Sequence, residues 1–117
     1  MKILKKISLL FTLILGSVAY GQDCTTVDLE TNLYSPSKLI TCDFNNDNKE
    51  DIVFIDSTGY NLFWKKNNGN NQFSDAIPLV GGAQILFLKS GDVNNDDFDD
   101  IIFTSSTSVY YVSYTGP

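Results

Sequence analysis

Two short stretches rich in Asp and Asn carry the side chains best suited to chemistry in this chain. They run from residue 43 to 52 and from 92 to 101, and oxygen-bearing side chains occupy positions 1, 3, 5 and 9 of both. Calcium takes about 6–8 hard oxygen ligands, and short Asp and Asn side chains supply them from a tightly curled backbone. Position 7 would contribute only its backbone carbonyl, so its side chain can vary. The predicted ligands of two Ca²⁺ ions are Asp43, Asn45, Asp47, Lys49 and Asp51 in the first loop and Asp92, Asn94, Asp96, Phe98 and Asp100 in the second.

Position 6 of each loop is occupied by Asn48 and Asp97. Such loops usually carry Gly here, because the backbone tends to be left-handed, and Asn and Asp are the other residues that tolerate it best. A similar pattern opens an EF-hand, which also needs a Glu at position 12 and a helix on either side. Position 12 is Phe54 in one loop and Phe103 in the other, each within an apolar β-type run. An EF-hand is therefore excluded.

The alternative to a metal site is an Asx-rich turn that binds nothing, since Asn and Asp favour turns. The recurrence of the same positions in both loops favours the metal, and so does the crowding of charge, because a bound cation would hold these acids together. Glu50 and Asp99 alternate away from the ligand positions and are expected to be solvated. Most of the 14 acidic residues lie in the two loops, namely Asp43, Asp47, Glu50, Asp51, Asp92, Asp96, Asp97, Asp99 and Asp100.

The composition excludes several classes of function. The net charge of −6 argues against nucleic-acid binding, because few cations are present to replace the counterions of phosphates. The chain has no His, which removes His-based catalytic triads and most zinc sites. Every close pair of carboxylates is already explained as metal ligands, so we expect no enzymatic activity.

The N-terminus predicts export. Lys2, Lys5 and Lys6 precede an apolar stretch at residues 7–19, which is shorter than the roughly 20 residues needed to span a bilayer. Residues 1–21 are therefore predicted to be a secretory signal peptide, which places the protein outside the cell or at its surface with no membrane span. Cys24 and Cys42 could then form a disulfide, or both could be unpaired thiols.

The chain contains an internal repeat with an offset of 49 residues. The predicted organisation is an N-terminal segment at 22–36, a first unit at 37–83 and an incomplete second unit at 84–117. The positions that match include the ligand residues and the apolar residues beside them: Leu39 and Leu88, Asp43 and Asp92, Asn45 and Asn94, Asn46 and Asn95, Asp47 and Asp96, Asp51 and Asp100, Ile52 and Ile101, Phe54 and Phe103.

Each unit is predicted to be a meander of β-strands. Runs of β-branched and aromatic residues separated by turn residues predict strands at 37–44, 51–56, 60–65, a Pro-interrupted edge strand at 72–80, and then 84–93, 100–105 and 108–114. A four-stranded meander of about 40–50 residues is typical of a β-propeller blade. The predicted fold is all-β, with about two four-stranded antiparallel blades, the second incomplete, from a larger propeller.

The two DxNxDxxxDI runs, at 43–52 and 92–101, resemble the VCBS/FG-GAP repeat of α-integrin-type propellers, and the resemblance extends to the aromatic and Asn-Gly segment at 64–73. It covers residues 37–114. The resemblance implies a calcium clip between adjacent strands of each blade, in a secreted protein of bacterial type. It also implies a role in adhesion or recognition.

The expected function is a non-catalytic binding, adhesion or scaffold module for a glycan or an extracellular protein. It would associate with further blades, supplied by a longer chain or another copy. The alternatives are a truncated propeller domain of an enzyme acting on extracellular polysaccharide, and a structural remnant that uses calcium only for folding. The aromatic residues are expected to pack between blades rather than to line a sugar-binding surface: Tyr60, Phe63, Trp64, Tyr110, Tyr111 and Tyr114.

Overall fold

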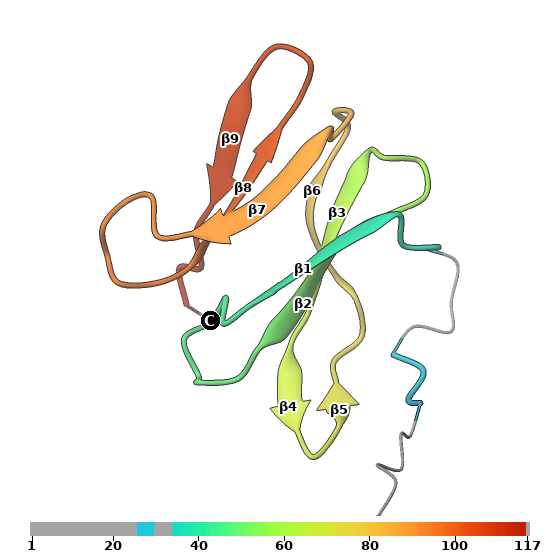
Figure 1. Cartoon of the computed structure of the whole chain (residues 1–117), viewed down its shortest axis with the longest axis vertical. Helices are drawn as coiled ribbons and strands as arrows, with labels where there is room; N and C mark the ends of the chain where they lie inside the picture. The colour runs from blue at the N-terminus through green and yellow to red at the C-terminus, as the bar shows by residue number, and fades with distance from the viewer. Residues whose placement is uncertain (1–25, 30–33, 117) are drawn as a thin grey trace, which may run out of the picture.

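The computed structural model describes residues 26–29 and 34–116, and these are all-β (Figure 1). The described residues contain three antiparallel sheets and no helix. The first sheet has the order β1-β2-β3-β6, the second sheet has the order β7-β8-β9, and β4 and β5 form a separate hairpin. The strands are β1 (Lys38–Cys42), β2 (Asp51–Ile55), β3 (Asn61–Lys65), β4 (Asn67–Gly69), β5 (Gln72–Phe73), β6 (Ile77–Gly81), β7 (Phe87–Gly91), β8 (Asp100–Thr104) and β9 (Val109–Val112).

The repeat in the sequence is also a repeat in the pairing of strands. Leu39 pairs with Phe54 in the first sheet, and Leu88, 49 residues after Leu39, pairs with Phe103 in the second. β2 and β8 are both short runs rich in β-branched and aromatic residues, which fit a pleated surface buried on both faces. The same sequence pattern therefore builds the first strand pair of each sheet in the same register.

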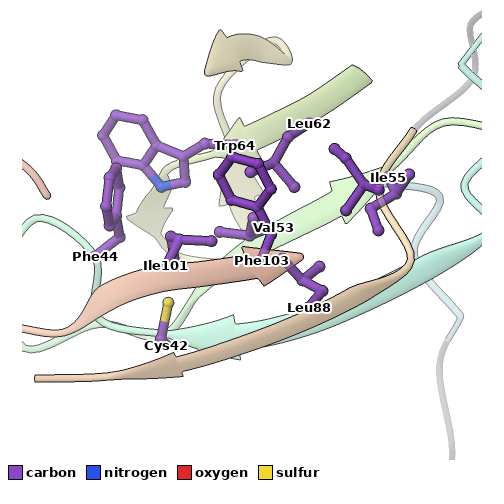
Figure 2. Close-up of a cluster of buried hydrophobic side chains, with 10 residues drawn as sticks. Cys42, Phe44, Val53, Ile55, Leu62, Trp64, Leu88, Ile101 and Phe103 are labelled. Atoms are coloured by element: carbon purple, nitrogen blue, oxygen red, sulfur yellow. The ribbon is translucent and has the colours of Figure 1, made fainter. Parts of the chain in front are cut away.

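The core lies between the two sheets, with β1 packed beside β7. Side chains alternate between the faces of a strand, so the first sheet presents one set of apolar residues to the second sheet and a different set to its far side. Figure 2 shows side chains from both sheets meeting in one cluster. Its buried members are Cys42, Phe44, Val53, Ile55, Leu62, Trp64, Ile85, Leu88, Ile101 and Phe103.

The far face of the first sheet is covered in part by residues 34–37, which we call the N-terminal strap. The ring of Tyr34 packs on that of Phe63, with centroids 4.2 Å apart. The backbone N–H of Ser57 donates to the Tyr34 carbonyl at 3.2 Å, and the N–H of Ser37 donates to the Ile55 carbonyl at 2.8 Å. Residues 26–29 lie on the opposite side of the first sheet from the second sheet (Figure 1).

The predicted single strand at 72–80 is wrong, because the chain divides there into β5 and β6. Lys66 and Ser74 close the β4–β5 hairpin: the Ser74 N–H donates to the Lys66 carbonyl and the Lys66 N–H donates to Ser74 Oγ, both at 2.9 Å. This pair of hydrogen bonds, which we call the Lys66–Ser74 bracket, separates the hairpin from β6, which then pairs with β3. The predicted edge position is confirmed, since β6 is the last strand of its sheet and its Pro78 lies beside a register shift.

The stretch between the predicted strands at 60–65 and 72–80 also contains a strand, because Asn67–Gly69 form β4. Asn70 and Asn71 make the tight turn itself with φ values of 52° and 58°. The other strands are shorter than predicted. β1 ends at Cys42 and β7 begins at Phe87, so the residues that follow β1 belong to the first acidic loop.

The aromatic residues divide into two groups. Phe63 and Trp64 are buried, and Trp64 meets Tyr114 edge-on in the core, as the sequence predicts. The expectation of burial is wrong for Tyr60 and Tyr111, which are 46% and 56% exposed. Tyr110 is 43% exposed, but its ring stacks on the buried Phe103 with centroids 5.2 Å apart.

The predicted signal peptide at 1–21 and the residue Cys24 lie outside the described residues, and with them the predicted disulfide. Among the described residues Cys42 has no disulfide partner, and it is buried in the core. Burial and then the nearby charge of Asp99 raise its pKa to about 12. In the described part of the chain, no helix is long and apolar enough to cross a membrane.

Asp56 organises the turn between β2 and β3, a role that was not predicted from the sequence. Its carboxylate accepts hydrogen bonds from Thr58 Oγ1 at 2.8 Å, from the Gly59 N–H at 3.0 Å and from Asn61 Nδ2 at 2.7 Å. Burial disfavours the charged form, but the hydrogen bonds from Asn61 and Thr58 outweigh it and lower the pKa of Asp56. Gly59 has a φ of 78°, which a side chain would strain.

Ile101 tests the packing of the sheets, because it is fully buried between them. We expect Ile101→Ala to lower the free energy of unfolding by about 2–5 kcal/mol, since it removes buried methyl groups and leaves a cavity. The matched control is Val109→Ala, at a position that is 72% exposed, with an expected change within about 0.5 kcal/mol. Urea unfolding measures both, and equal effects would show that the sheets do not pack in this way.

Protonation of Asp56 should make the free energy of unfolding depend on pH. A carboxyl group whose pKa is lower in the folded state stabilises the fold above its unfolded pKa of about 3.9, and this contribution is lost as the pH falls through the folded pKa. We expect the free energy of unfolding to fall less steeply below about pH 4 in Asp56→Asn than in the wild type. Asp75→Asn removes the same charge from an exposed position and is the control. Identical slopes for wild type and Asp56→Asn would contradict the assignment.

Candidate metal-binding loops

The two acidic loops occupy equivalent places in the two sheets. The first connects β1 to β2 and the second connects β7 to β8. Position 9 of each loop, Asp51 or Asp100, is already the first residue of the following strand. The paired strands therefore hold both ends of each loop.

In the first loop, hydrogen bonds to the position-1 carboxylate curl the backbone. Asp43 Oδ1 accepts the N–H of Asp47 at 2.9 Å, and Asp43 Oδ2 accepts the N–H of Asn48 at 2.7 Å. Asp47 in turn accepts the Lys49 N–H through Oδ1 at 3.1 Å and the side-chain amide of Asn45 through Oδ2 at 3.2 Å. The structure thus gathers positions 1, 3 and 5 within one turn.

The second loop repeats this arrangement position by position. Asp92 Oδ1 accepts the N–H of Asp96 at 3.1 Å, and Asp92 Oδ2 accepts the N–H of Asp97 at 3.0 Å. Asp96 accepts the Phe98 N–H at 3.0 Å and the side-chain amide of Asn94 at 2.8 Å. Because the sequence repeat reproduces the same hydrogen bonds, the curl of the loop follows from the positions of its Asp and Asn residues.

The left-handed backbone predicted at position 6 is confirmed. Asn48 has a φ of 62° and Asp97 a φ of 68°. Position 4 is left-handed too, with φ values of 54° at Asn46 and 63° at Asn95. These Asn and Asp residues stand where other side chains would strain the backbone.

The position-9 carboxylates are buried at the base of each loop. Asp51 is 0% exposed and Asp100 is 1% exposed. Asp51 Oδ1 accepts the N–H of Asn67 in the β4–β5 hairpin at 2.7 Å. Asp100 accepts the Val93 N–H at 3.0 Å through Oδ2 and the Ser113 hydroxyl through Oδ1. Each carboxylate therefore ties its loop and strand to a later part of the same repeat.

Burial raises the pKa of Asp51, although the N–H of Asn67 and the indole of Trp64 partly oppose it. The indole N–H lies near the carboxylate, but Trp64 Nε1 and Asp51 Oδ2 do not reach hydrogen-bond geometry and neither has another partner. Trp64 is therefore a close neighbour of the carboxylate and not its hydrogen-bond donor.

The first loop contains two buried oxygen atoms without a hydrogen-bond partner, Asn45 Oδ1 and Asp51 Oδ2. Leaving a buried acceptor unsatisfied costs about 1–3 kcal/mol, and these two atoms belong to predicted ligand positions 3 and 9. Oxygens of this kind suit a hard cation such as Ca²⁺. The residues of the first loop therefore fit the predicted metal.

The second loop fits less closely. Asn94 Oδ1 accepts the N–H of Asp96 at 3.0 Å, and both oxygens of Asp100 are occupied. Residues 92–98 are exposed, whereas the corresponding ligand positions of the first loop are half-buried. The two sites are thus alike in sequence and unlike in environment.

Among the described residues, no three Cys, Asp or Glu side chains are clustered in a way that would hold a metal ion. In both loops the carboxylates point some of their oxygens at backbone N–H groups. The first loop also has two cations close to its position-5 carboxylate, since Asp47 Oδ2 lies 3.5 Å from Lys49 Nζ and 3.8 Å from Lys66 Nζ. Lys66 was not predicted from the sequence, because only the fold brings it to the loop.

Asp99 differs from expectation, because it is half-buried instead of solvated, while Glu50 is exposed as predicted. Burial raises the pKa of Asp99, and the negative charges of Glu50 and Asp43 raise it further. Asp99 belongs to the second loop, and these two acids belong to the first. The packing of the sheets therefore brings the acids of both loops into one electrostatic field.

Asn48 tests the left-handed curl of the first loop. A left-handed backbone costs most residues about 1–2 kcal/mol, so we expect Asn48→Ala to lower the free energy of unfolding by about 1 kcal/mol and Asn48→Gly to change it less. Asn68→Ala is the matched control, since Asn68 is exposed and does not have a positive φ. The unfolding midpoint in urea measures all three. Equal losses for both Ala variants would contradict a strained position at Asn48.

Comparison with known proteins places these loops in a family. Residues 43–103 match the FG-GAP-like repeat, a region that begins at position 1 of the first loop and ends within β8. No curated protein and no solved structure matches the chain. The matched region covers more than half of the sequence and contains both loops, and a repeat of this type fits the blade-like first sheet. The chain belongs to the FG-GAP-like repeat family.

Proposed function

We propose that this protein is a secreted, non-catalytic binding module of the FG-GAP-like repeat type, whose two acidic loops bind calcium. The observation that carries the proposal is the pair of buried, unpartnered oxygens on Asn45 and Asp51 in the first loop. Membership of the family supports a binding or scaffold role. The sequence of residues 1–21 supports export.

The side chains of each loop have separable roles in this proposal. Positions 1, 3, 5 and 9 would supply side-chain oxygens, and position 7 its backbone carbonyl. Bound calcium supplies positive charge and a fixed point of attachment for oxygen ligands. Asp43 and Asp92 keep the loops curled through their hydrogen bonds to backbone N–H groups. Asp51 and Asp100 link each loop to the core of its sheet.

The crowding of acids gives calcium a second effect. Asp99 lies in the field of Glu50 and Asp43, and these charges repel one another across the junction of the sheets. A divalent cation in either loop would reduce that repulsion and stabilise the packed pair of sheets. Calcium sites in extracellular modules have dissociation constants of about 10⁻⁴–10⁻³ M, which suits an exported protein.

A catalytic role is less well supported. The sequence has neither His nor Arg, and the carboxylates of both loops accept backbone N–H groups. The partner proposed for the module is a glycan or an extracellular protein, and the exposed Tyr60, Tyr110 and Tyr111 support it. These side chains are flat, partly apolar surfaces with a polar tip, which suit such contacts.

Calcium titration with thermal unfolding tests the proposal. Metal that binds only the folded state stabilises it by about 2.7 kcal/mol at 100 times its dissociation constant, and about 1 kcal/mol raises the Tm of a small domain by roughly 4–8 °C. We expect millimolar calcium to raise the Tm of the wild type by several degrees and to leave the double variant Asp43→Ala, Asp92→Ala almost unchanged. Of the single variants, Asp43→Ala should lose more of the effect, because the first loop fits the ion better.

Asp75→Ala is the control for charge, since it removes an exposed acid from outside both loops. It should keep the full response to calcium, and equimolar magnesium should stabilise the wild type less. A wild-type Tm that does not move with calcium would refute the metal site. A response that persists in the double variant would place the ion elsewhere.

A further inference from the structure

The sequence repeat places identical residues on the two sheets. Each sheet packs one face against the other sheet, and its opposite, outer face has no sheet of the described residues against it. Leu39, Ile52 and Phe54 of the first sheet are identical to Leu88, Ile101 and Phe103, 49 residues later. In the second sheet these three side chains form the buried face that packs against the first sheet. Identical residues in a matching register should form matching surfaces.

In the first sheet the same three residues lie on the opposite face, away from the second sheet. Leu39 pairs with Phe54, and Phe54 with Phe63, so they share one face. The core instead receives the alternate residues of β2, Val53 and Ile55. We define the outer face of the first sheet by Leu39, Ile52, Phe54 and Phe63. This face has the same residue types as the surface that the second sheet presents to the first, but the second sheet does not pack against it.

The second sheet has the reciprocal property. The counterparts of Val53 and Ile55 are Ile102 and Thr104, which lie on its outer face and are only half-buried. Strand pairing places Tyr111 beside Ile102, and Phe87 and Val109 beside Thr104. Phe87, Val109 and Tyr111 are 59%, 72% and 56% exposed. The outer face of the second sheet is defined by Phe87, Lys89, Ile102, Thr104, Val109 and Tyr111.

We propose that the protein self-associates head to tail, with the outer face of the second sheet of one copy receiving the outer face of the first sheet of another. The contact would continue the packing that already joins the two sheets within one copy. Such an interface uses two different surfaces, so it is heterologous and forms rings or open chains of copies. It depends on the stacking of the sheets and not on the calcium sites.

The N-terminal strap competes for one of these surfaces. Tyr34 packs on Phe63 and, at 6.4 Å between ring centroids, on Phe54. Beside the strap, a cavity of about 90 Å³ remains over the same face, and Leu39 is still 61% exposed. Phe54 and Phe63 are only 2% and 7% exposed, so a docking copy would take the place of the Tyr34 ring and of Leu29 and Pro36, which line the cavity. The strap therefore acts as a partial cap that limits association.

Net charge opposes association as well, because the whole chain carries −6 and would lose three Lys with the proposed signal peptide. Salt screens repulsion between exposed charges, so association should strengthen as the salt concentration rises. Lys89 on the outer face of the second sheet can keep its ammonium group in water while its stem covers apolar surface. The contact itself would be made by the apolar side chains of the two faces.

Complementary blocked variants test the proposal. Leu39→Lys blocks the outer face of the first sheet, and Tyr111→Lys blocks that of the second; both positions are exposed, so the fold should tolerate them, which circular dichroism and thermal unfolding verify. Sedimentation velocity at high salt, with calcium and with chelator, measures assembly over a range of protein concentrations. We expect the wild type to assemble with rising concentration and Tyr34→Ala to assemble at lower concentration. Each blocked variant alone should remain a single copy.

The mixture of the two blocked variants is the decisive sample. Each variant keeps the surface that the other lacks, so a 1:1 mixture should form a complex of two copies and grow no further. Tyr60→Lys, at an exposed position outside both faces, should assemble like the wild type. The proposal is overturned if wild type and Tyr34→Ala both stay single copies at every concentration. It is also overturned if either blocked variant pairs with itself, or if the mixture does not form the two-copy complex.

Discussion

A buried carboxylate at the base of each acidic loop is the constraint on which the rest of the structure depends. Asp51 and Asp100 are almost fully excluded from solvent. A buried carboxylate must be paired or hydrogen-bonded to be tolerated, and each one finds its partners in different segments of its own repeat. Asp51 reaches the β4–β5 hairpin, and Asp100 reaches the start of its loop and Ser113. Each of these carboxylates thus connects its acidic loop and the second strand of its sheet to the segment that follows the third strand.

The attachment of each loop to its sheet also means that the packing of the sheets sets the distance between the loops. Because the loops begin and end in paired strands, the stacking of the sheets also brings the loops near each other, and Asp99 lies in the field of the first loop. Apolar packing between the sheets therefore works against repulsion between the loops. A proposed calcium ion would relieve the repulsion. The outer face of the second sheet is exposed and that of the first is partly covered by the N-terminal strap, and both offer apolar surface to a further sheet. The packing of the sheets therefore depends both on the charges of the loops and on the apolar area of the sheet faces.

The sequence predicted the features that depend on local pattern. The loops, their left-handed position 6, and the strand pairs β1–β2 and β7–β8 follow from Asp and Asn spacing and from β-branched runs. It did not predict the division of residues 72–80, because the bracket between Lys66 and Ser74 forms only when β4 folds back. Nor could it place Asp99 in the field of the other loop, or Tyr34 on Phe63. These contacts arise from packing between segments distant in sequence, and spacing carries no signal of them.

The most direct test of the central claim, that the acidic loops bind calcium, uses the single Trp of the chain as a probe. Trp64 lies beside Asp51, a predicted ligand, so a lanthanide in the first loop would receive energy from its excited indole. Terbium occupies calcium sites because it is also a hard, oxygen-seeking cation. Excitation of Trp64 should produce terbium emission that calcium displaces and that Asp43→Ala removes while Asp75→Ala retains it. Absence of sensitised emission, or emission that calcium does not displace, would contradict calcium binding by the first loop.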